Sequence, residues 1–144
     1  MGTRDIIHDP VKRALIKSGW EITADPLVID YDDLMVFADL AADRPLAAQR
    51  GTERIAVEIK SFVGMSAVRD FEFAIGQYQL YRSLLEVTDP ARMLFLAVSE
   101  AIFAEFFERP AIRLVVRRYQ IACISVDVER EEVVRWIDWR NIEP

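Results

Sequence analysis

The 144-residue sequence contains one cysteine, Cys123, and one histidine, His8. The single cysteine excludes a disulfide bond within the chain and a zinc site built from several cysteines. The single histidine excludes a metal site built from several histidines, and a serine hydrolase would depend on His8 alone. A metal ion in this protein would therefore be held mainly by carboxylate oxygens.

The sequence also lacks a long uninterrupted hydrophobic run. Charged residues break its apolar stretches well short of the ~20 residues that a membrane-spanning helix needs, so we expect no transmembrane helix and no membrane partner. The first residues include Arg4, Asp5 and His8 in place of a continuous apolar segment, so we expect no signal peptide. Together these absences predict a cytoplasmic protein.

Basic residues are fewer than acidic ones. The chain has 18 lysines and arginines against 24 aspartates and glutamates, which gives a net charge of −6 and a pI near 4.9. A general nucleic-acid binder usually has the opposite balance. A local basic face can still contact DNA, and Arg113, Arg117 and Arg118 are the candidates for it. The alternative is that these arginines form the solvated side of a helix.

The sequence has enough hydrophobic residues, 52% of the total, to form a core. The chain has the length of one ordinary domain and shows no repeat, low-complexity tract or linker, so we interpret residues 1–144 as a single domain. Apolar periodicity predicts helices over residues 5–18, 66–86, 101–107 and 110–119. It predicts strands over residues 20–29 (an edge strand interrupted at Pro26), 34–41, 46–49, 54–62, 93–98, 121–128 and 133–139. This order indicates an α/β or α+β domain with a central sheet.

The segment Ile55–Lys60 places charges within a strongly apolar strand. Because side chains alternate along a strand, Glu58 and Lys60 share one face with Ala56, and the branched aliphatic side chains lie on the other. A surface ion pair on an amphipathic strand has the same pattern, so the strand alone leaves both interpretations open.

Asp39 adds a second carboxylate within an apolar run, where a charge is costly unless it is paired or binds a cation. A hairpin can bring Asp39 near Glu58, and a divalent cation would relieve the repulsion between the two carboxylates. Mg²⁺ prefers such hard oxygen ligands, with water or phosphate completing its coordination. Lys60 would then orient or deprotonate a metal-bound water, or stabilise negative charge that develops on a phosphate.

Gln77 and Tyr81 are four residues apart, so they share one face of the helix predicted over residues 66–86. Gly76, directly before them, suits a close contact with a ligand or with backbone. A packed Tyr81 beside a solvated Gln77 has the same spacing, so this interpretation also stays open.

Taken in order, Asp39, Glu58-x-Lys60 and Gln77-x-x-x-Tyr81 resemble the motifs of the PD-(D/E)XK nuclease superfamily, whose members share the restriction-endonuclease-like fold. More narrowly, the chain resembles the XisH family, the fdxN element excision controlling factors. A lone Glu-x-Lys is weak support, whereas an ordered series of matching segments over most of the chain is specific. The segments that carry the resemblance are residues 5–8, 11–20, 39–43, 55–62, 76–82, 94–98 and 132–137.

The resemblance implies a restriction-endonuclease-like core, in which helices flank a central mixed sheet, and phosphodiester hydrolysis that depends on Mg²⁺ or Mn²⁺. Asp39 and Glu58 would match the two metal-binding acids of the superfamily, and Lys60 its catalytic lysine. Gln77 and Tyr81 would match the helix motif that some members place beside the active site and the DNA.

Three positions depart from the implied pattern. Many superfamily members carry an acid on the first helix, where this chain has His8, with Asp5 as a nearby substitute. His8 is then either a ligand or a semi-buried structural histidine. The separation of Asp39 from the second acid is long for the motif, so Asp43 is an alternative first acid. Gln49 offers a neutral oxygen where the family often carries a glutamate.

The first functional hypothesis is a metal-dependent, endonuclease-like protein that acts on DNA in site-specific excision or rearrangement. The alternative is a catalytically inactive accessory protein that regulates a recombinase through protein contacts, as the acidic pI, His8 and Gln49 suggest. The resemblance also implies a companion protein of the XisI type. We also consider a homodimer, because nucleases that cut both strands often act as dimers.

Overall fold

The central mixed sheet flanked by helices that the sequence predicts is present in the computed structural model, which describes residues 5–46 and 51–139. Within these residues, no helix is long and apolar enough to cross a membrane. In chain order the elements are α1 (His8–Lys17), β1 (Glu21–Ala24), β2 (Leu27–Tyr31), β3 (Leu34–Ala38), β4 (Leu40–Pro45), β5 (Thr52–Ile59), α2 (Ala67–Thr88), β6 (Arg92–Ser99), α3 (Glu100–Ile102), the π-helix η1 (Phe103–Phe107), α4 (Pro110–Arg118), β7 (Cys123–Asp127) and β8 (Glu132–Ile137).

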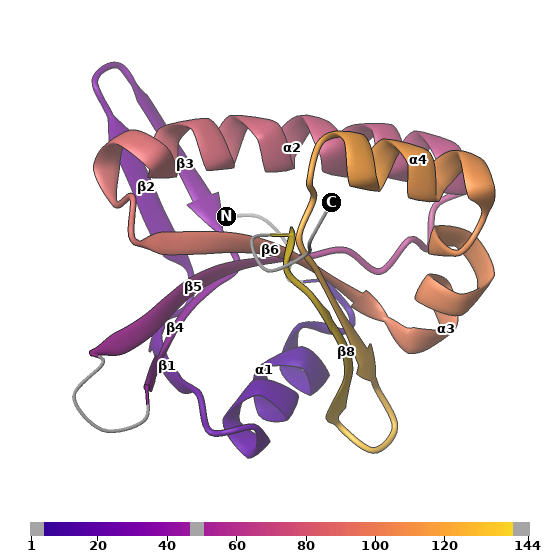
Figure 1. Ribbon diagram of the computed structural model, residues 1–144, viewed down its shortest axis with the longest axis horizontal. Coiled ribbons are helices and arrows are strands. Elements are labelled where there is room, and N and C mark those ends of the chain that lie inside the picture. The colour runs from indigo at the N-terminus through magenta and orange to yellow at the C-terminus, as the bar shows by residue number, and fades with distance from the viewer. Residues whose placement is uncertain (1–4, 47–50, 140–144) are drawn as a thin grey trace.

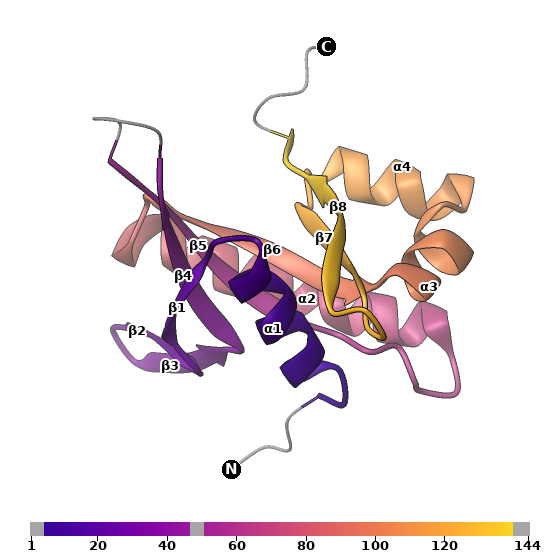
Figure 2. The same ribbon diagram turned by 90° about the horizontal axis from the view of Figure 1, so that it is seen from below.

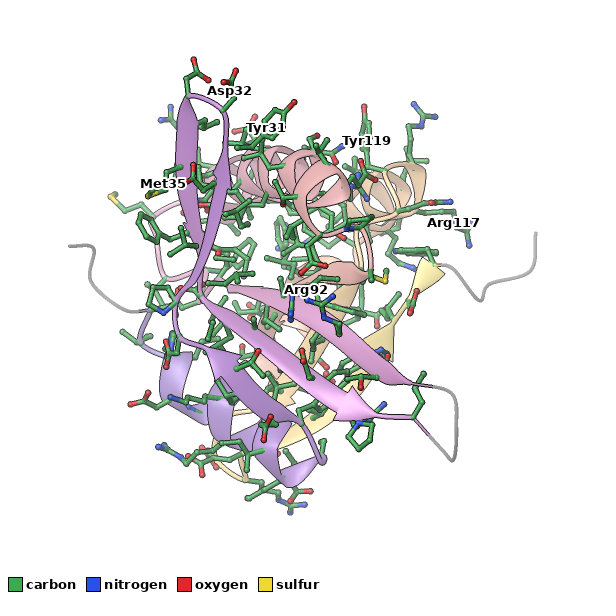
Figure 3. The ribbon with its side chains drawn as sticks, turned by 90° about the vertical axis from the view of Figure 1, so that its left-hand side faces the viewer. Tyr31, Asp32, Met35, Arg92, Arg117 and Tyr119 are labelled. Atoms are coloured by element: carbon green, nitrogen blue, oxygen red, sulfur yellow. The ribbon has the colours of Figure 1, made fainter. Side chains whose placement is uncertain are left out.

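Six of the strands form one sheet in the order β1-β4-β5-β6-β7-β8. The central pairs β5–β6 and β6–β7 are parallel, and the outer pairs are antiparallel. Helix α2 connects the parallel strands β5 and β6, as a parallel pair requires. Strands β2 and β3 form a separate two-stranded ribbon, which packs against α2 and leaves the tip at Asp32 outside the body of the protein (Figures 1 and 3).

The sheet separates two hydrophobic clusters, one on each face. Helix α1 covers one face, and α2, η1 and α4 cover the other (Figures 1 and 2). The sheet arches over α1, so that Trp20, which precedes β1, stacks on Trp136 of β8 with ring centroids 5.5 Å apart. The predicted alternation along β5 is confirmed, because Ile55, Val57 and Ile59 belong to the α1 cluster while Ala56 belongs to the opposite cluster.

Helix α2 begins where the sequence predicts, because the hydroxyl of Ser66 accepts a hydrogen bond from the Arg69 N–H at 3.2 Å and caps the first turn. Its buried face includes Phe71, Ala74, Tyr78, Tyr81 and Leu85 at helical spacing. The Tyr78 hydroxyl donates to the Leu94 carbonyl at 2.9 Å and accepts from the Ala122 N–H at 3.0 Å. These two bonds fix the middle of α2 against the sheet.

Two strand predictions are wrong in an informative way. Residues 20–29 form two strands in different sheets and not one interrupted edge strand, since Ile29 of β2 is buried in the cluster beneath α2 while β1 pairs with β4. Residues 34–41 are likewise divided, between β3 and β4, and Asp39 lies at the division. The strand predicted over 46–49 falls mostly outside the described residues, and the hairpin partner of β5 is Leu40–Pro45.

Candidate active site

Glu58 is the last residue but one of β5, and its side chain lies on the face of the sheet that α2 covers. The neighbouring strands β4 and β6 enclose it, so that only 5% of its surface is exposed. Its Oε2 lies 3.4 Å from the Lys60 ammonium, and its Oε1 is buried without a hydrogen-bond partner in the described part of the chain. This burial excludes a surface ion pair and leaves an oxygen unsatisfied at a free-energy cost.

Asp39 reaches the same place from the break between β3 and β4. Its Oδ2 accepts a hydrogen bond from the Ile59 N–H at 2.7 Å, so a side chain replaces the main-chain partner that a continuous strand would supply. Because Leu40 pairs with Val57, the Asp39 carboxylate lies beside Glu58. The structure thus brings together the two acids that the sequence places 19 positions apart.

The two carboxylates perturb each other. Burial, and then the charge of Asp39, raise the pKa of Glu58 to about 8. Burial also raises the pKa of Asp39, although the Ile59 N–H, the His8 charge and a hydrogen bond with Glu58 act in the opposite direction. Near neutral pH the pair therefore retains a proton, which a bound cation would displace.

Lys60 completes the group at the end of β5. Its N–H continues the ladder by donating to the Ala97 carbonyl at 3.0 Å, which fixes its backbone. Its side chain is 21% exposed against 6% for that of Glu58, so the ammonium lies between the buried carboxylates and solvent. The ammonium also lies 4.9 Å from the centroid of the Phe73 ring on α2.

Gln77 and Tyr81 cover this group from α2. The Gln77 side-chain amide donates to the Tyr81 hydroxyl at 3.1 Å, and the Gln77 Oε1 is a second buried oxygen without a partner among the described residues. Burial, followed by the charges of Glu58 and Asp39, raises the pKa of Tyr81. Tyr81 is therefore within electrostatic reach of both acids.

The first helix is tied to the same end of β5. Asp5 accepts hydrogen bonds from the Ser61 N–H at 2.9 Å and from the Ile7 N–H at 3.1 Å. His8 is 3% exposed, and its Nε2 lies 2.9 Å from Asp25 Oδ1. Its Nδ1 is buried without a partner in the described residues, and its charge contributes to the electrostatics of Asp39.

Other predicted residues lie elsewhere. Asp43 is opposite Arg54, toward the other end of β5, and pairs with Arg92 at 3.1 Å, so the structure removes Asp43 as the alternative first acid. A Cβ added to Gly76 would meet no protein atom within 4 Å, so no backbone packs closely against this glycine, and a ligand contact there stays a prediction. Gln49 lies outside the described residues.

The three arginines of α4 are also separate from the acids. Arg113 and Arg117 line a cavity beside β8, and Arg118 does not. Figure 3 shows Arg117 projecting outward from α4. The structure therefore does not bring these arginines to the carboxylate pair.

Sequence reasoning missed Phe73. It precedes Gln77 by four residues, as Gln77 precedes Tyr81, so the three form one row along α2. That spacing was the available signal, but an aromatic residue on a helix usually indicates core packing. Phe73 is instead 63% exposed while lying beside the Lys60 ammonium.

The donor chemistry fits a hard dication. Among the described residues no group of three or more histidine, cysteine, aspartate or glutamate side chains could hold a metal. The pair Asp39 and Glu58 supplies carboxylate oxygens, and the unsatisfied Oε1 atoms of Glu58 and Gln77 are further oxygen acceptors. Two carboxylates with the remaining positions left to water suit Mg²⁺.

Comparisons with known proteins give a consistent result. A family model described as XisH protein matches residues 1–134. The crystal structure of an XisH family protein from Nostoc punctiforme PCC 73102 is 38% identical, covers 93% of this chain and 100% of its own, and has a TM-score of 0.85. The crystal structure of an fdxN element excision controlling factor protein from Anabaena variabilis is also 38% identical, with 94% and 100% coverage and a TM-score of 0.85. No curated protein matches the chain.

Proposed function

This chain belongs to the XisH family, and from that premise we propose that it is a metal-dependent, endonuclease-like protein that takes part in site-specific DNA excision. The observation that carries the proposal is the convergence of Asp39, Glu58 and Lys60 at one end of β5, with a buried Glu58 oxygen left unsatisfied. The excision process is taken from the description of the Anabaena variabilis protein.

In the proposed reaction Asp39 and Glu58 would hold Mg²⁺ or Mn²⁺, and such an ion would neutralise their charge and that of a nearby phosphate. Lys60 is the more exposed member of the group, with its ammonium 3.4 Å from Glu58 Oε2, so it would meet a phosphodiester that approaches the acids from solvent. It stabilises the negative charge that develops on the phosphate and orients the water.

The surrounding residues have positioning roles in this proposal. Asp5 fixes the backbone directly after Lys60 through the Ser61 N–H. Gln77 and Tyr81 limit the space above the carboxylates and present a hydroxyl and an amide to the substrate or to Lys60. His8 is bound to Asp25 and makes no hydrogen bond with Asp39 in the described part of the chain, so in this proposal it acts on Asp39 only through electrostatics.

The direct test is cleavage of supercoiled plasmid and of branched DNA in Mg²⁺ by the wild-type protein and by Glu58→Ala. Glu53→Ala is the matched control, because Glu53 lies on the same strand and pairs with Arg44 away from the acids. We expect wild type and control to cut, and Glu58→Ala to cut at least about a hundredfold more slowly. Equal rates for Glu58→Ala and wild type would contradict the assignment.

A second candidate function is a catalytically inactive accessory protein that regulates a recombinase. One observation favours it: the helix-one position that carries an acid in many nucleases is here His8, bound to Asp25. Calorimetric titration with Mg²⁺ and Mn²⁺, alone and with a companion of the XisI type, separates the two functions. Absence of metal binding and of cleavage in both states would favour the accessory role.

A further inference from the structure

A cavity of about 510 Å³ lies between α4, η1 and β8, on the same face of the sheet as Glu58. Its volume falls within the range of about 300–1,000 Å³ typical of ligand sites. Apolar side chains form much of its wall, among them Phe103, Leu114, Ile137 and Trp139. An apolar group can therefore be buried there.

One cation on the cavity wall, Arg135, is already paired with carboxylates. The Arg135 guanidinium binds Glu100 at 3.0 Å, contacts Glu108, and lies 4.7 Å from the centroid of the Phe103 ring. Arg135 therefore does not require a further anion.

Two other cations on the wall differ from Arg135. Arg113 and Arg117 are exposed, and within residues 5–46 and 51–139 neither guanidinium has a hydrogen-bond or ion-pair partner. They lie four residues apart on α4, which separates them by about 6 Å along the helix axis. Two acidic groups at that spacing would complement them.

The cavity also borders an open edge of the sheet. Strand β8 is the last in the strand order, and among the described strands its only ladder partner is β7. An edge strand leaves a row of main-chain groups available to an added extended segment. In such a segment, alternate side chains are about 6.6 Å apart and point to the same face, so one face of the segment can present its side chains to α4.

We propose that this cavity and the β8 edge bind an extended acidic peptide segment of a partner protein. Two carboxylates at alternate positions pair with Arg113 and Arg117, and a neighbouring apolar side chain enters the cavity. The sugar-phosphate backbone of DNA fits less well, because it offers no apolar group to enter the cavity.

The proposed site is separate from the carboxylate pair. Glu58 pairs with Leu96, Leu96 with Cys123, and Cys123 with Ile137, so three strand spacings, about 14 Å, separate the acid from the cavity. The inference therefore stands or falls independently of nuclease activity.

The test begins with a random 12-residue peptide library on phage, selected on the wild-type protein and counter-selected on R113Q/R117Q. We expect enriched peptides to carry acidic residues at alternate positions with an adjacent apolar residue. A labelled synthetic peptide of that sequence should bind the double variant about tenfold or more weakly by fluorescence anisotropy. Arg118→Gln is the matched control, because Arg118 is on the same helix but does not line the cavity.

Hydrogen exchange gives a second readout, since bound peptide should slow exchange of amides within Glu132–Ile137. Three results would overturn the proposal: no enrichment, equal peptide binding by R113Q/R117Q and wild type, or unchanged exchange in β8 at saturating peptide. A labelled 20-base-pair duplex in place of the peptide tests the rival ligand, and loss of duplex binding in R113Q/R117Q but not in Arg118→Gln would also overturn it.

Discussion

The charged side chains at the two ends of strand β5 are arranged differently: arginines pair with aspartates at one end, and two carboxylates lie side by side at the other. At its beginning, Arg92 pairs with Asp43 at 3.1 Å and with Asp89 at 3.0 Å, and Arg54 pairs with Asp89 at 2.8 Å (Figure 3 labels Arg92). Arg92 also donates to the Ile55 carbonyl at 2.9 Å. At its end, two carboxylates lie together and one Glu58 oxygen has no partner in the described residues.

The difference separates a structural use of charge from a functional one. A buried network in which acids and bases alternate and hydrogen bonds are complete stabilises the fold only while it is intact. A buried pair of like charges destabilises the fold and persists where a ligand can complete it. We therefore expect the two ends to differ in how substitution, pH and a divalent cation change the free energy of unfolding.

The largest effect is expected at the complete end. Arg92→Ala removes the buried guanidinium that Asp43 and Asp89 share and leaves the Ile55 carbonyl without its donor, so the free energy of unfolding should fall by about 3 kcal/mol. Urea unfolding followed by circular dichroism measures it. Arg54→Ala, which removes a more exposed guanidinium, is the control and should cost far less. Equal losses in both variants would break the comparison.

The next largest effect is expected in how the free energy of unfolding depends on pH, which Glu58 near the end of β5 should control. Because the pKa of Glu58 is raised in the folded state, the folded protein binds more protons than the unfolded chain, and its stability should fall as pH rises from the unfolded-state pKa toward about 8. We expect a loss of about 2 kcal/mol between pH 5.5 and pH 8 without metal. Urea unfolding across this range should show a smaller loss for Glu58→Gln.

The same experiment with Mg²⁺ sharpens the result. If Asp39 and Glu58 hold the cation, 10 mM Mg²⁺ should restore wild-type stability at pH 8, because the ion binds only the folded state. It should not stabilise Glu58→Gln to the same extent. Stabilisation of both proteins alike would place the cation elsewhere.

A smaller effect is expected on the helix that covers the acids. A Cβ at Gly76 would meet open space, so Gly76→Ala should raise the free energy of unfolding by about 1 kcal/mol through helix propensity. Thermal unfolding measures the change. A destabilised variant would show that α2 needs the glycine at this position after all.

The smallest effect is expected at Phe73. Replacing its ring by Phe73→Leu removes the contact with the Lys60 ammonium and should cost about 0.5 kcal/mol, whereas Phe73→Tyr should keep it. Chemical denaturation of the two variants side by side provides the comparison. If they prove equally stable, the ring does not hold the lysine.

Local patterns in the sequence predicted which residues form this site, but they did not predict how the strands that carry these residues are arranged. Alternation along residues 55–60 correctly assigned the faces of β5, and the four-residue spacing correctly placed Gln77 and Tyr81 together on α2. The break of the strand at Asp39 was not predictable in this way, because it depends on a main-chain donor 20 residues later. For the same reason, periodicity could not show that residues 20–29 divide between two sheets, since the choice is made by burial against α2.

The exclusion of Asp43 illustrates the limit in a single residue. Asp39 and Asp43 lie on the same face of an extended segment, so sequence parity alone cannot separate them. What separates them is the identity of the residues across the ladder: Asp43 lies opposite Arg54 and binds Arg92, while Asp39 meets the Ile59 N–H.

The stacked indoles of Trp20 and Trp136 join the two margins of the arched sheet on the side away from the acids. Any event that flattens the arch must pull these rings apart. Exciton coupling between them in far-ultraviolet circular dichroism would therefore act as a built-in optical gauge of sheet curvature, readable without attaching a label.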